Sequence, residues 1–451
     1  MEERNIIIKS GSFIKNSASL KIAVIVIITL LLLIPLSMVK ALINERGIRQ
    51  DQVIYEISRK WGTAQTVAGP VLSVPYKVFR QNSNNITDPP AVTRYAHFLP
   101  ETLNIKGTVE PEIRYRGIYE ALLYRSDLEI SGEFAHPDLH KFSIEPDAIM
   151  WDKAFLSMGI SDMSGIQEQV SGKVAKKDVV LEPGIETADL FQSGVSAHFS
   201  LKDETASLPF TFKISINGNR NLSFLPLGKE TGVLLSSTWP DPSFSGQFLP
   251  NTREVSNSGF SAGWKVLHLN RNYPQSWKGK RSDLSAALFG VSLHPGTEIY
   301  QKSMRTAKYG AMFVLFTFTA FFLAEVINKT RIHPIQYLLV GCSIIIFYVL
   351  LLALSEHMGF NISFFISAVA VVLLISGYTR SILSRKMAVA LCAILTTLYG
   401  YLFITLQLED YALLVGSLGL FATLTVVMYL TRKVDWYGVQ PSSGSTGIGA
   451  E

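Results

Sequence analysis

The stretch that decides the fold runs from Ala311 to Phe360 and reads AMFVLFTFTAFFLAEVINKTRIHPIQYLLVGCSIIIFYVLLLALSEHMGF. It contains two apolar runs, each close to the roughly 20 residues that a helix needs to cross the hydrocarbon core of a bilayer. The turn NKTRIHP between them holds Lys329, Arg331 and His333, whereas SEHMGF after the second run has no Lys or Arg. Because Lys and Arg are retained on the cytoplasmic side of a membrane, the basic turn is predicted to face the cytoplasm.

The composition indicates that the apolar residues are concentrated in part of the chain. Of the 451 residues, 48% are hydrophobic and 17% are charged, which is too apolar for an ordinary soluble enzyme and too charged for a pure transporter. The net charge of +5 is small and is explained by basic membrane flanks, so nucleic-acid binding is not expected. Both cysteines, Cys342 and Cys392, fall inside predicted membrane spans, so the rest of the chain cannot be held by disulfides.

The N-terminal part predicts a membrane anchor. Residues 1–21 are polar and are expected in the cytoplasm, and residues 22–43 are expected to form the first transmembrane helix. The apolar run is longer than that of a signal peptide and has no small-x-small cleavage site, which favours an uncleaved anchor. Pro35 is predicted to kink this helix near its end.

Residues 44–64 predict a short amphipathic helix at the start of the next domain. Val53, Ile54, Ile57 and Trp61 recur at helical spacing. Two placements remain open, docking on the domain that follows or lying in the lipid headgroup region.

Residues 44–308 predict a β-rich periplasmic domain, which is large enough to form its own hydrophobic core. Apolar and polar residues alternate in many short runs separated by Gly, Pro, Asn and Asp, among them FTFKISI (210–216), LSFLPL (222–227) and VLLSSTW (233–239). Because no long helix separates the runs, we expect an antiparallel sandwich, divided into two subdomains near residues 180–205.

The remaining spans follow the same charge rule as the opening hairpin. A five-helix bundle is predicted in residues 309–431, with spans at about 309–327, 335–354, 361–378, 387–406 and 411–430. The loops predicted inside are basic and those predicted outside are neutral or acidic. The sequence thus predicts a multi-pass α-helical protein of the bacterial inner membrane with six spans, cytoplasmic N- and C-termini, a cytoplasmic tail at 432–451, and a large inserted, mostly-β, sandwich-like extracytoplasmic domain.

One carboxylate, Glu325, lies inside an apolar run and is therefore a candidate functional residue. Lys329 lies four residues later, which favours an ion pair at the interface, while a proton or ligand site is the alternative. His333 and Gln336 complete the candidate intramembrane polar site, and helix entry among lipid headgroups is favoured for them over ligand binding.

Motifs that would identify an enzyme or metal site are absent from the sequence. There is no HExxH pattern, nucleophile elbow, P-loop or dinucleotide fingerprint. The adjacent pair Glu356 and His357 has no third ligand nearby and is expected to be a solvated loop. No catalytic residue, metal or cofactor is therefore expected.

Residues 238–264 contain a cluster of aromatic side chains among turn-forming residues. The members of this candidate binding loop are Trp239, Phe244, Phe248, Phe260 and Trp264. They either line a groove for a glycan, peptide or lipid, or anchor a long loop on the sandwich core.

Several long stretches resemble the CreD family of bacterial inner-membrane proteins. They are LLLIPLSMVKALINER (31–46), VAGPVLSVPY (67–76), YRGIYEALLYRSDLEISGEF (115–134), STWPDPSFSGQFLPNTREVSNSGFSAGW (237–264), RIHPIQYLLVGCSIIIFYVLLLALSEHMGF (331–360) and TRKVDWY (431–437). The resemblance implies a role in cell envelope integrity, a carbon-source-responsive two-component regulon, colicin tolerance, altered β-lactam susceptibility and a stress response. It supplies no catalytic residues.

Three hypotheses for function follow. The first is a non-enzymatic inner-membrane protein that supports the envelope, with the β domain binding a protein, glycan or lipid. The second is a transporter or lipid-handling protein that works through the membrane bundle and Glu325. The third is an enzyme acting on an envelope polymer, which would need clustered carboxylates or a nucleophile with a base in one cleft.

Overall fold

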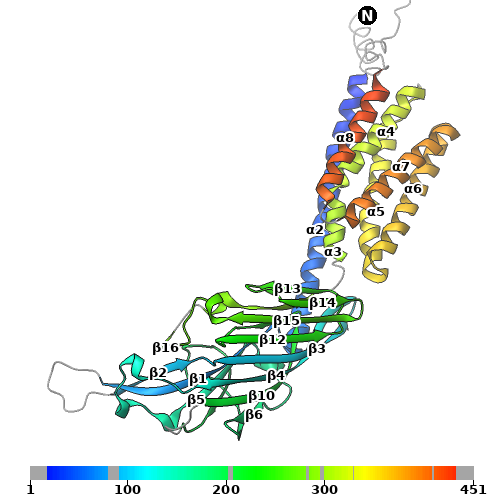
Figure 1. Cartoon of the computed structure of the whole chain (residues 1–451). Helices are drawn as coiled ribbons and strands as arrows, with labels where there is room; N and C mark the ends of the chain where they lie inside the picture. The colour runs from blue at the N-terminus through cyan, green and yellow to red at the C-terminus, as the bar shows by residue number, and fades with distance from the viewer. Residues whose placement is uncertain are drawn as a thin grey trace, which may run out of the picture. The chain divides into compact units, whose positions relative to one another are not determined.

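The computed structural model describes residues 18–79, 91–201, 207–280, 284–294, 299–328, 330–408 and 411–432. The chain divides into two compact units, a membrane unit of residues 1–49 and 297–451 and a β unit of residues 50–296. Long apolar helices make up the first and many strands the second (Figure 1). The predicted combination of a multi-pass helical protein with a large inserted, mostly-β domain is therefore confirmed.

The helices are long and mostly apolar, except for the short and polar helix Ile299–Lys308. Their bounds are α2 Ala18–Trp61, α3 Ile299–Lys308, α4 Gly310–Asn328, α5 Pro334–Met358, α6 Phe360–Ile382, α7 Arg385–Gln407 and α8 Ala412–Thr431. Within the described residues, five of them (α2, α4, α5, α6 and α7) are long and apolar enough to cross a membrane, and α8 contributes a shorter apolar stretch, Leu414–Tyr429. The predicted number of six spans and the orientation of the termini remain predictions.

The membrane unit has an apolar interior and an apolar exterior. Phe318, Phe347 and Leu391 are buried between helices, whereas Phe365 and Phe421 are 70% exposed. Exposed aromatic and aliphatic side chains on long helices are unfavourable in water and favourable in hydrocarbon. These helices are therefore suited to direct contact with lipid.

Helix α2 corrects the expected division between an anchor and a separate amphipathic helix. It is continuous from Ala18 to Trp61 and contains Pro35. The residues after the anchor, including Glu45 and Lys60, are compatible with helix, and no Gly-Pro pair interrupts the chain until Gly69. The boundary expected near residue 44 is thus a change in polarity along one helix.

The last turns of α2 dock on the β unit, which decides between the two predicted placements. Ile54, Ile57 and Trp61 pack against Ala121 and Leu123. Both of these partners belong to strand β4 (Tyr119–Ala135). Burial of this apolar helix face stabilises the α2 end by the hydrophobic effect.

The β unit contains seventeen strands among the described residues. Their bounds are β1 Gln65–Phe79, β2 Ala91–Phe98, β3 Thr102–Arg116, β4 Tyr119–Ala135, β5 Phe155–Ile160, β6 Ser171–Val174, β7 Lys177–Val180, β8 Glu182–Pro183, β9 Gly194–His198, β10 Ser207–Asn219, β11 Asn221–Phe224, β12 Glu230–Ser237, β13 Pro242–Gly246, β14 Thr252–Ser256, β15 Gly259–Leu267, β16 Ser276–Lys278 and β17 Phe289–Leu293. The nine-stranded sheet has the order β13-β17-β11-β1-β5-β9-β8, with β2 beside β1 and β16 beside β2. The eight-stranded sheet has the order β14-β15-β12-β3-β4-β10-β6-β7.

Both sheets are mixed, which corrects the prediction of an antiparallel sandwich. Strand β1 pairs with β11 in parallel, and so does β12 with β3. Alternation of apolar and polar residues gives the two faces of a strand but not the direction of its neighbour. The parallel pairs join segments more than 100 residues apart along the chain, so no local turn could indicate them.

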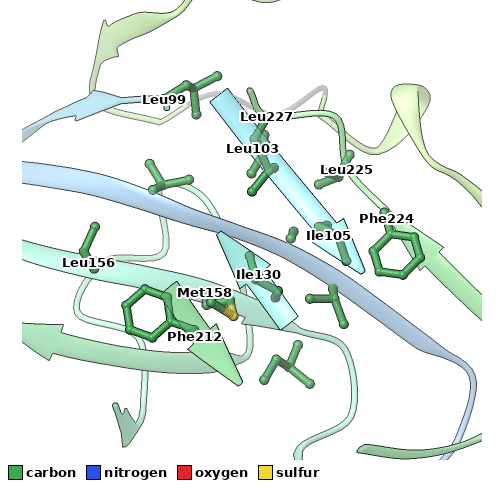
Figure 2. Packing of buried hydrophobic residues seen from close by; sticks show 14 of the residues in the cluster. Leu99, Leu103, Ile105, Ile130, Leu156, Met158, Phe212, Phe224, Leu225 and Leu227 are labelled. Atoms are coloured by element: carbon green, nitrogen blue, oxygen red, sulfur yellow. The ribbon is translucent and has the colours of Figure 1, made fainter. Parts of the chain in front are cut away.

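One hydrophobic core lies between the two sheets (Figure 2). Leu103, Ile105 and Ile130 come from the eight-stranded sheet, and Leu156 and Met158 come from the nine-stranded sheet. The described residues show no division near residues 180–205, because β10 and β12 from the later half pair with β4 and β3 from the earlier half. The β unit is a single sandwich.

Residues 299–308 form helix α3, although they were expected within the β-rich segment. Ser303, Thr306 and Ala307 are buried on one side of it, and its cationic residues, Lys302, Arg305 and Lys308, follow one another three residues apart. A 3.6-residue period explains this distribution better than a two-residue period. The strands therefore end before α3.

Candidate functional site

The aromatic residues of 238–264 form part of the sandwich, which corrects the candidate binding loop. Strands β13, β14 and β15 occupy most of this segment. Phe260 and Trp264 are buried in the core at 4% and 3% exposure, and Trp239, Phe244 and Phe248 are partly buried against the same core. The interpretation as core anchors is the one that the structure favours.

The contacts of these rings lie within the domain. The Trp264 ring lies 5.6 Å from the Phe244 ring and 5.9 Å from that of Phe289 in β17. The Trp264 Nε1–H donates to the Phe248 carbonyl at 3.2 Å, and Trp239 Nε1–H donates to the His294 carbonyl at 3.2 Å. Both indole donors are therefore satisfied inside the domain.

Glu325 lies at the meeting point of α2, α4 and α5. Its side chain is 5% exposed and pairs with the Lys21 ammonium group. The Tyr337 hydroxyl donates to its Oε2 at 3.1 Å, and the backbone N–H of Ile332 donates to its Oε1 at 3.3 Å. A buried carboxylate needs such partners to remain charged.

The partner of Glu325 in this arrangement is Lys21, 304 residues away along the chain. Lys329, which the sequence suggested, lies outside the described residues. An ion pair near the helix ends is thus present, but it connects α4 to the first turns of α2. Three donors surround the carboxylate, which favours a role in holding helices together.

His333 and Gln336 form the start of α5. The Ile335 N–H donates to His333 Nδ1 at 3.3 Å, and the His333 N–H donates to Gln336 Oε1 at 2.9 Å. This reciprocal pair is a capping box, followed by Pro334 in the first helical position. Their side chains satisfy the free backbone groups of the helix start, so they do not extend the Glu325 site.

No group of three or more His, Cys, Asp or Glu side chains that could hold a metal ion occurs among the described residues. Glu356, considered with His357 in the sequence, instead accepts a hydrogen bond from the Tyr300 hydroxyl at 3.0 Å. Arg46 lies 4.0 Å from the same carboxylate.

A shallow groove of about 880 Å³ lies on the eight-stranded sheet, on the face turned away from the core. One row of side chains crosses it on five neighbouring strands: Ser261 of β15, Ser236 of β12, Thr108 of β3, Asp127 of β4 and Ser215 of β10. These residues are direct partners in the strand register. They bring five separate segments of the chain together in one line.

A second row runs beside the first, two residues away from it on β12, β3, β4 and β10, and continues onto β6. It consists of Leu234, Lys106, Glu129, Lys213 and Ser171, again direct partners in the register. The central three positions alternate in charge from positive to negative to positive.

Arg125 and Glu168 stand at one side of the groove. The Arg125 Nε–H donates to the Ser215 hydroxyl at 3.3 Å, and its guanidinium lies 3.8 Å from the Glu168 carboxylate. The groove therefore contains three cationic and three anionic side chains, together with several hydroxyl groups.

A serine and a histidine of the nine-stranded sheet are aligned with a carboxylate from the turn between β8 and β9. The Ser73 hydroxyl lies 2.9 Å from His97 Nδ1, and His97 Nε2 lies 3.4 Å from the Asp189 carboxylate. An ionised carboxylate can only accept hydrogen bonds, so we assign the His97 ring proton to Nε2, which faces Asp189. The Ser73 hydroxyl is then the donor to His97 Nδ1. This order of groups is also the order used by nucleophilic hydrolases.

The serine of this network is inaccessible to solvent. Ser73 and His97 are both 0% exposed. Burial lowers the pKa of His97, although the hydrogen bond and the charge of Asp189 act in the opposite direction. A nucleophile needs access to its substrate, so this geometry is that of a buried structural network.

Sequence analysis missed both the groove and the buried network. Thr108 and Asp127, or Ser73 and His97, are neighbours only because of strand register. No local spacing identifies them. In the sequence, the groove is indicated by polar residues at every second position, Lys106 and Thr108 in one strand and Asp127 and Glu129 in the next. The same pattern is found on any strand face that is exposed to solvent.

Comparison with known proteins covers both units of the chain. The family model described as inner membrane protein CreD matches residues 17–437. The chain is 32% identical over 418 residues to the inner membrane protein CreD of Escherichia coli (strain K12), and the match covers 90% of this chain and 91% of that protein. A match of this extent includes the apolar helices, the β unit and the residues of the groove. The chain belongs to the CreD family of inner membrane proteins.

Proposed function

We propose that this CreD-family protein is a non-enzymatic inner-membrane protein that supports cell-envelope integrity by binding an envelope component through its β unit. The apolar helices anchor the protein, and the positions of basic residues along the sequence favour a periplasmic location for the β unit. The observation that carries the proposal is the groove across β15, β12, β3, β4 and β10.

The groove suits binding better than catalysis. Two of its three carboxylates, Asp127 and Glu129, are on one strand of a solvent-exposed sheet face, and the third, Glu168, lies 3.8 Å from the Arg125 guanidinium. A general acid or base usually needs partial burial or close charged partners that adjust its pKa. Ser73, His97 and Asp189 are of the residue types found in hydrolase active sites, but Ser73 and His97 are fully buried, which supports a non-enzymatic role.

Crosslinking in living cells tests this proposal. A photo-crosslinking amino acid would be placed at Thr108 or Ser236 in the groove, and at Lys177 on the far edge strand β7 as a control. We expect adducts at both groove positions and few at Lys177. The absence of adducts at the groove, or equal adducts at all three positions, would overturn the proposal.

A second candidate function, substrate or lipid handling by the membrane unit, depends on Glu325. Its burial among apolar helices is the observation that favours it. The three donors already bound to the carboxylate favour a structural role instead. The substitution that separates these roles is described in the Discussion.

A further inference from the structure

The floor of the groove presents hydroxyl groups at the spacing of β strands. Ser261, Ser236 and Thr108 are exposed and occupy consecutive strands, and Asp127 continues their row. Neighbouring strands lie about 4.8 Å apart, so the five positions of the row extend over about 19 Å. Hydroxyls act as both donors and acceptors, and a carboxylate accepts from two hydroxyl groups at once.

The second row supplies charges without internal partners. Lys106, Glu129 and Lys213 are exposed cross-strand neighbours, yet none of them forms an ion pair within 4 Å in the described part of the chain, and the same holds for Asp127. Their charged groups are thus available to a ligand. Hydrogen bonds to charged groups are stronger than those between neutral groups.

The composition of the groove excludes several ligand classes. Leu234 is its one exposed large apolar side chain among the described residues, so an acyl chain would find little apolar surface. A stable protein interface normally centres on aromatic or aliphatic anchors, which this groove does not present. Equal numbers of cations and anions would not select a polyphosphate backbone.

We propose that the groove binds a glycan strand that carries amino-acid or peptide substituents. Sugar hydroxyl and acylamino groups would run along the row from Ser261 to Asp127. Carboxylate and ammonium groups of the substituents would meet Lys106, Glu129 and Lys213. This inference deepens the proposed function and rests on it, because it names the ligand class of the same groove.

Direct binding to the full chain in detergent micelles tests the ligand class. The titrated probes would be a disaccharide-tetrapeptide released from bacterial cell wall, the free tetrapeptide and chitotetraose. We expect saturable binding of the disaccharide-tetrapeptide, with each of the other two probes at least about tenfold weaker, because each meets only one of the two rows.

Substitutions in the groove should weaken this binding while controls on the same face should not. Lys106→Ser, Glu129→Gln and the space-filling Ser236→Phe are each expected to reduce affinity at least about tenfold. The matched controls Lys265→Ser, Glu133→Gln and Thr102→Phe change exposed residues outside the groove and should bind normally. Thermal unfolding of each variant would verify that it is folded.

The outcomes separate this inference from the proposed function. If no probe binds, or if folded groove variants bind as tightly as the controls, the glycan assignment is wrong. In that case, groove-specific crosslinks to an envelope protein would leave the proposed function standing. Absence of groove crosslinks together with absence of probe binding would overturn both.

Discussion

Glu325 is buried in the membrane unit and is bound by donors from several elements. Its carboxylate lies at the end of α4 and receives Lys21 from α2, Tyr337 from α5 and the backbone of Ile332. Each donor comes from a different part of the membrane unit. The residue therefore connects elements that are distant in sequence.

Glu325→Gln should destabilise the membrane unit. The amide removes the negative charge that pairs with Lys21, and we expect the free energy of unfolding to fall by about 1–3 kcal/mol. The loss is limited because the Lys21 ammonium group is partly exposed and can be solvated by water. Thermal stability of the full chain in micelles would measure the change, with Lys21→Ala as the matched partner variant. Normal stability combined with a lost envelope phenotype would instead support a transport role.

His97 should make stability depend on pH. Its folded pKa is lowered by burial, so the unfolded chain binds more protons as the pH falls through about 6.5. This contribution to stability is therefore complete at higher pH, decreases as the pH falls below about 6.5, and levels off below the folded pKa. Its polar partners are Ser73 and Asp189, and the centre of the Trp277 ring lies 5.8 Å from that of the His97 ring.

Urea unfolding of the full chain at pH 7.5 and pH 5 would test this prediction. We expect the unfolding midpoint of the β unit to fall between these values in the wild-type chain, and to fall less in His97→Gln. An equal pH dependence in both proteins would show that other groups cause it. Burial raises the pKa of Asp162, but hydrogen bonds from Ser164 and Thr63 lower it more, so its contribution to stability is present above about pH 4 and is lost only below that pH, outside the range compared.

At the scale of elements, the last turns of α2 are stabilised by packing on the β unit. The Arg114 guanidinium lies 3.8 Å from the centre of the Trp61 ring, and Trp61 Nε1–H donates to the Tyr124 carbonyl at 3.3 Å. Ile54 is buried beside them. The amphipathic pattern thus reflects contact with a protein surface.

Trp61→Ala should loosen this end of α2. Loss of the half-buried ring and of the cation–π contact with Arg114 is expected to cost about 2 kcal/mol. Trypsin cleavage after Arg59 or Lys60 would then be faster than in the wild-type chain. Tyr55→Ala, which removes a ring that is 59% exposed, is the control and should leave cleavage unchanged.

The aromatic side chains of strands β13 to β15 are expected to contribute to the stability of the β unit. Trp264 is 3% exposed and contacts Phe244 and Phe289. Trp264→Ala should therefore destabilise the β unit by about 3–5 kcal/mol. Trp239→Ala, at a partly buried position, should reduce the free energy of unfolding by less. The denaturant midpoints of the two full-length variants would be compared. A fully folded Trp264→Ala protein that fails to bind ligand would restore the binding-loop hypothesis.

At the scale of the whole molecule, function depends on which side of the membrane carries the β unit. The basic turn between α4 and α5 and the basic residues after α6 favour the cytoplasm for those loops and the periplasm for the β unit. A periplasmic location would place the groove among envelope polymers.

Topology reporters would check this orientation. A reporter active only in the periplasm, fused near residue 200, should be active, and proteases added to spheroplasts should digest the β unit. The same reporter fused after the C-terminus should be inactive. Cytosolic activity near residue 200 would contradict both the topology and the proposed function.

The sequence by itself determined the classes of structure. Apolar runs of bilayer length specify membrane-spanning helices, since the backbone hydrogen bonds of a helix are all satisfied within it. Alternating runs specify strands with one buried face, and the positions of the two cysteines excluded disulfides from the β unit. These properties depend only on neighbouring residues.

Only the tertiary structure decided which distant residues meet. Strand register brings Ser236, Thr108 and Asp127 into one row and seals Ser73 against His97. Helix packing pairs Lys21 with Glu325. Register and helix packing are set by the combined burial of many side chains, so no single spacing along the chain could reveal these contacts.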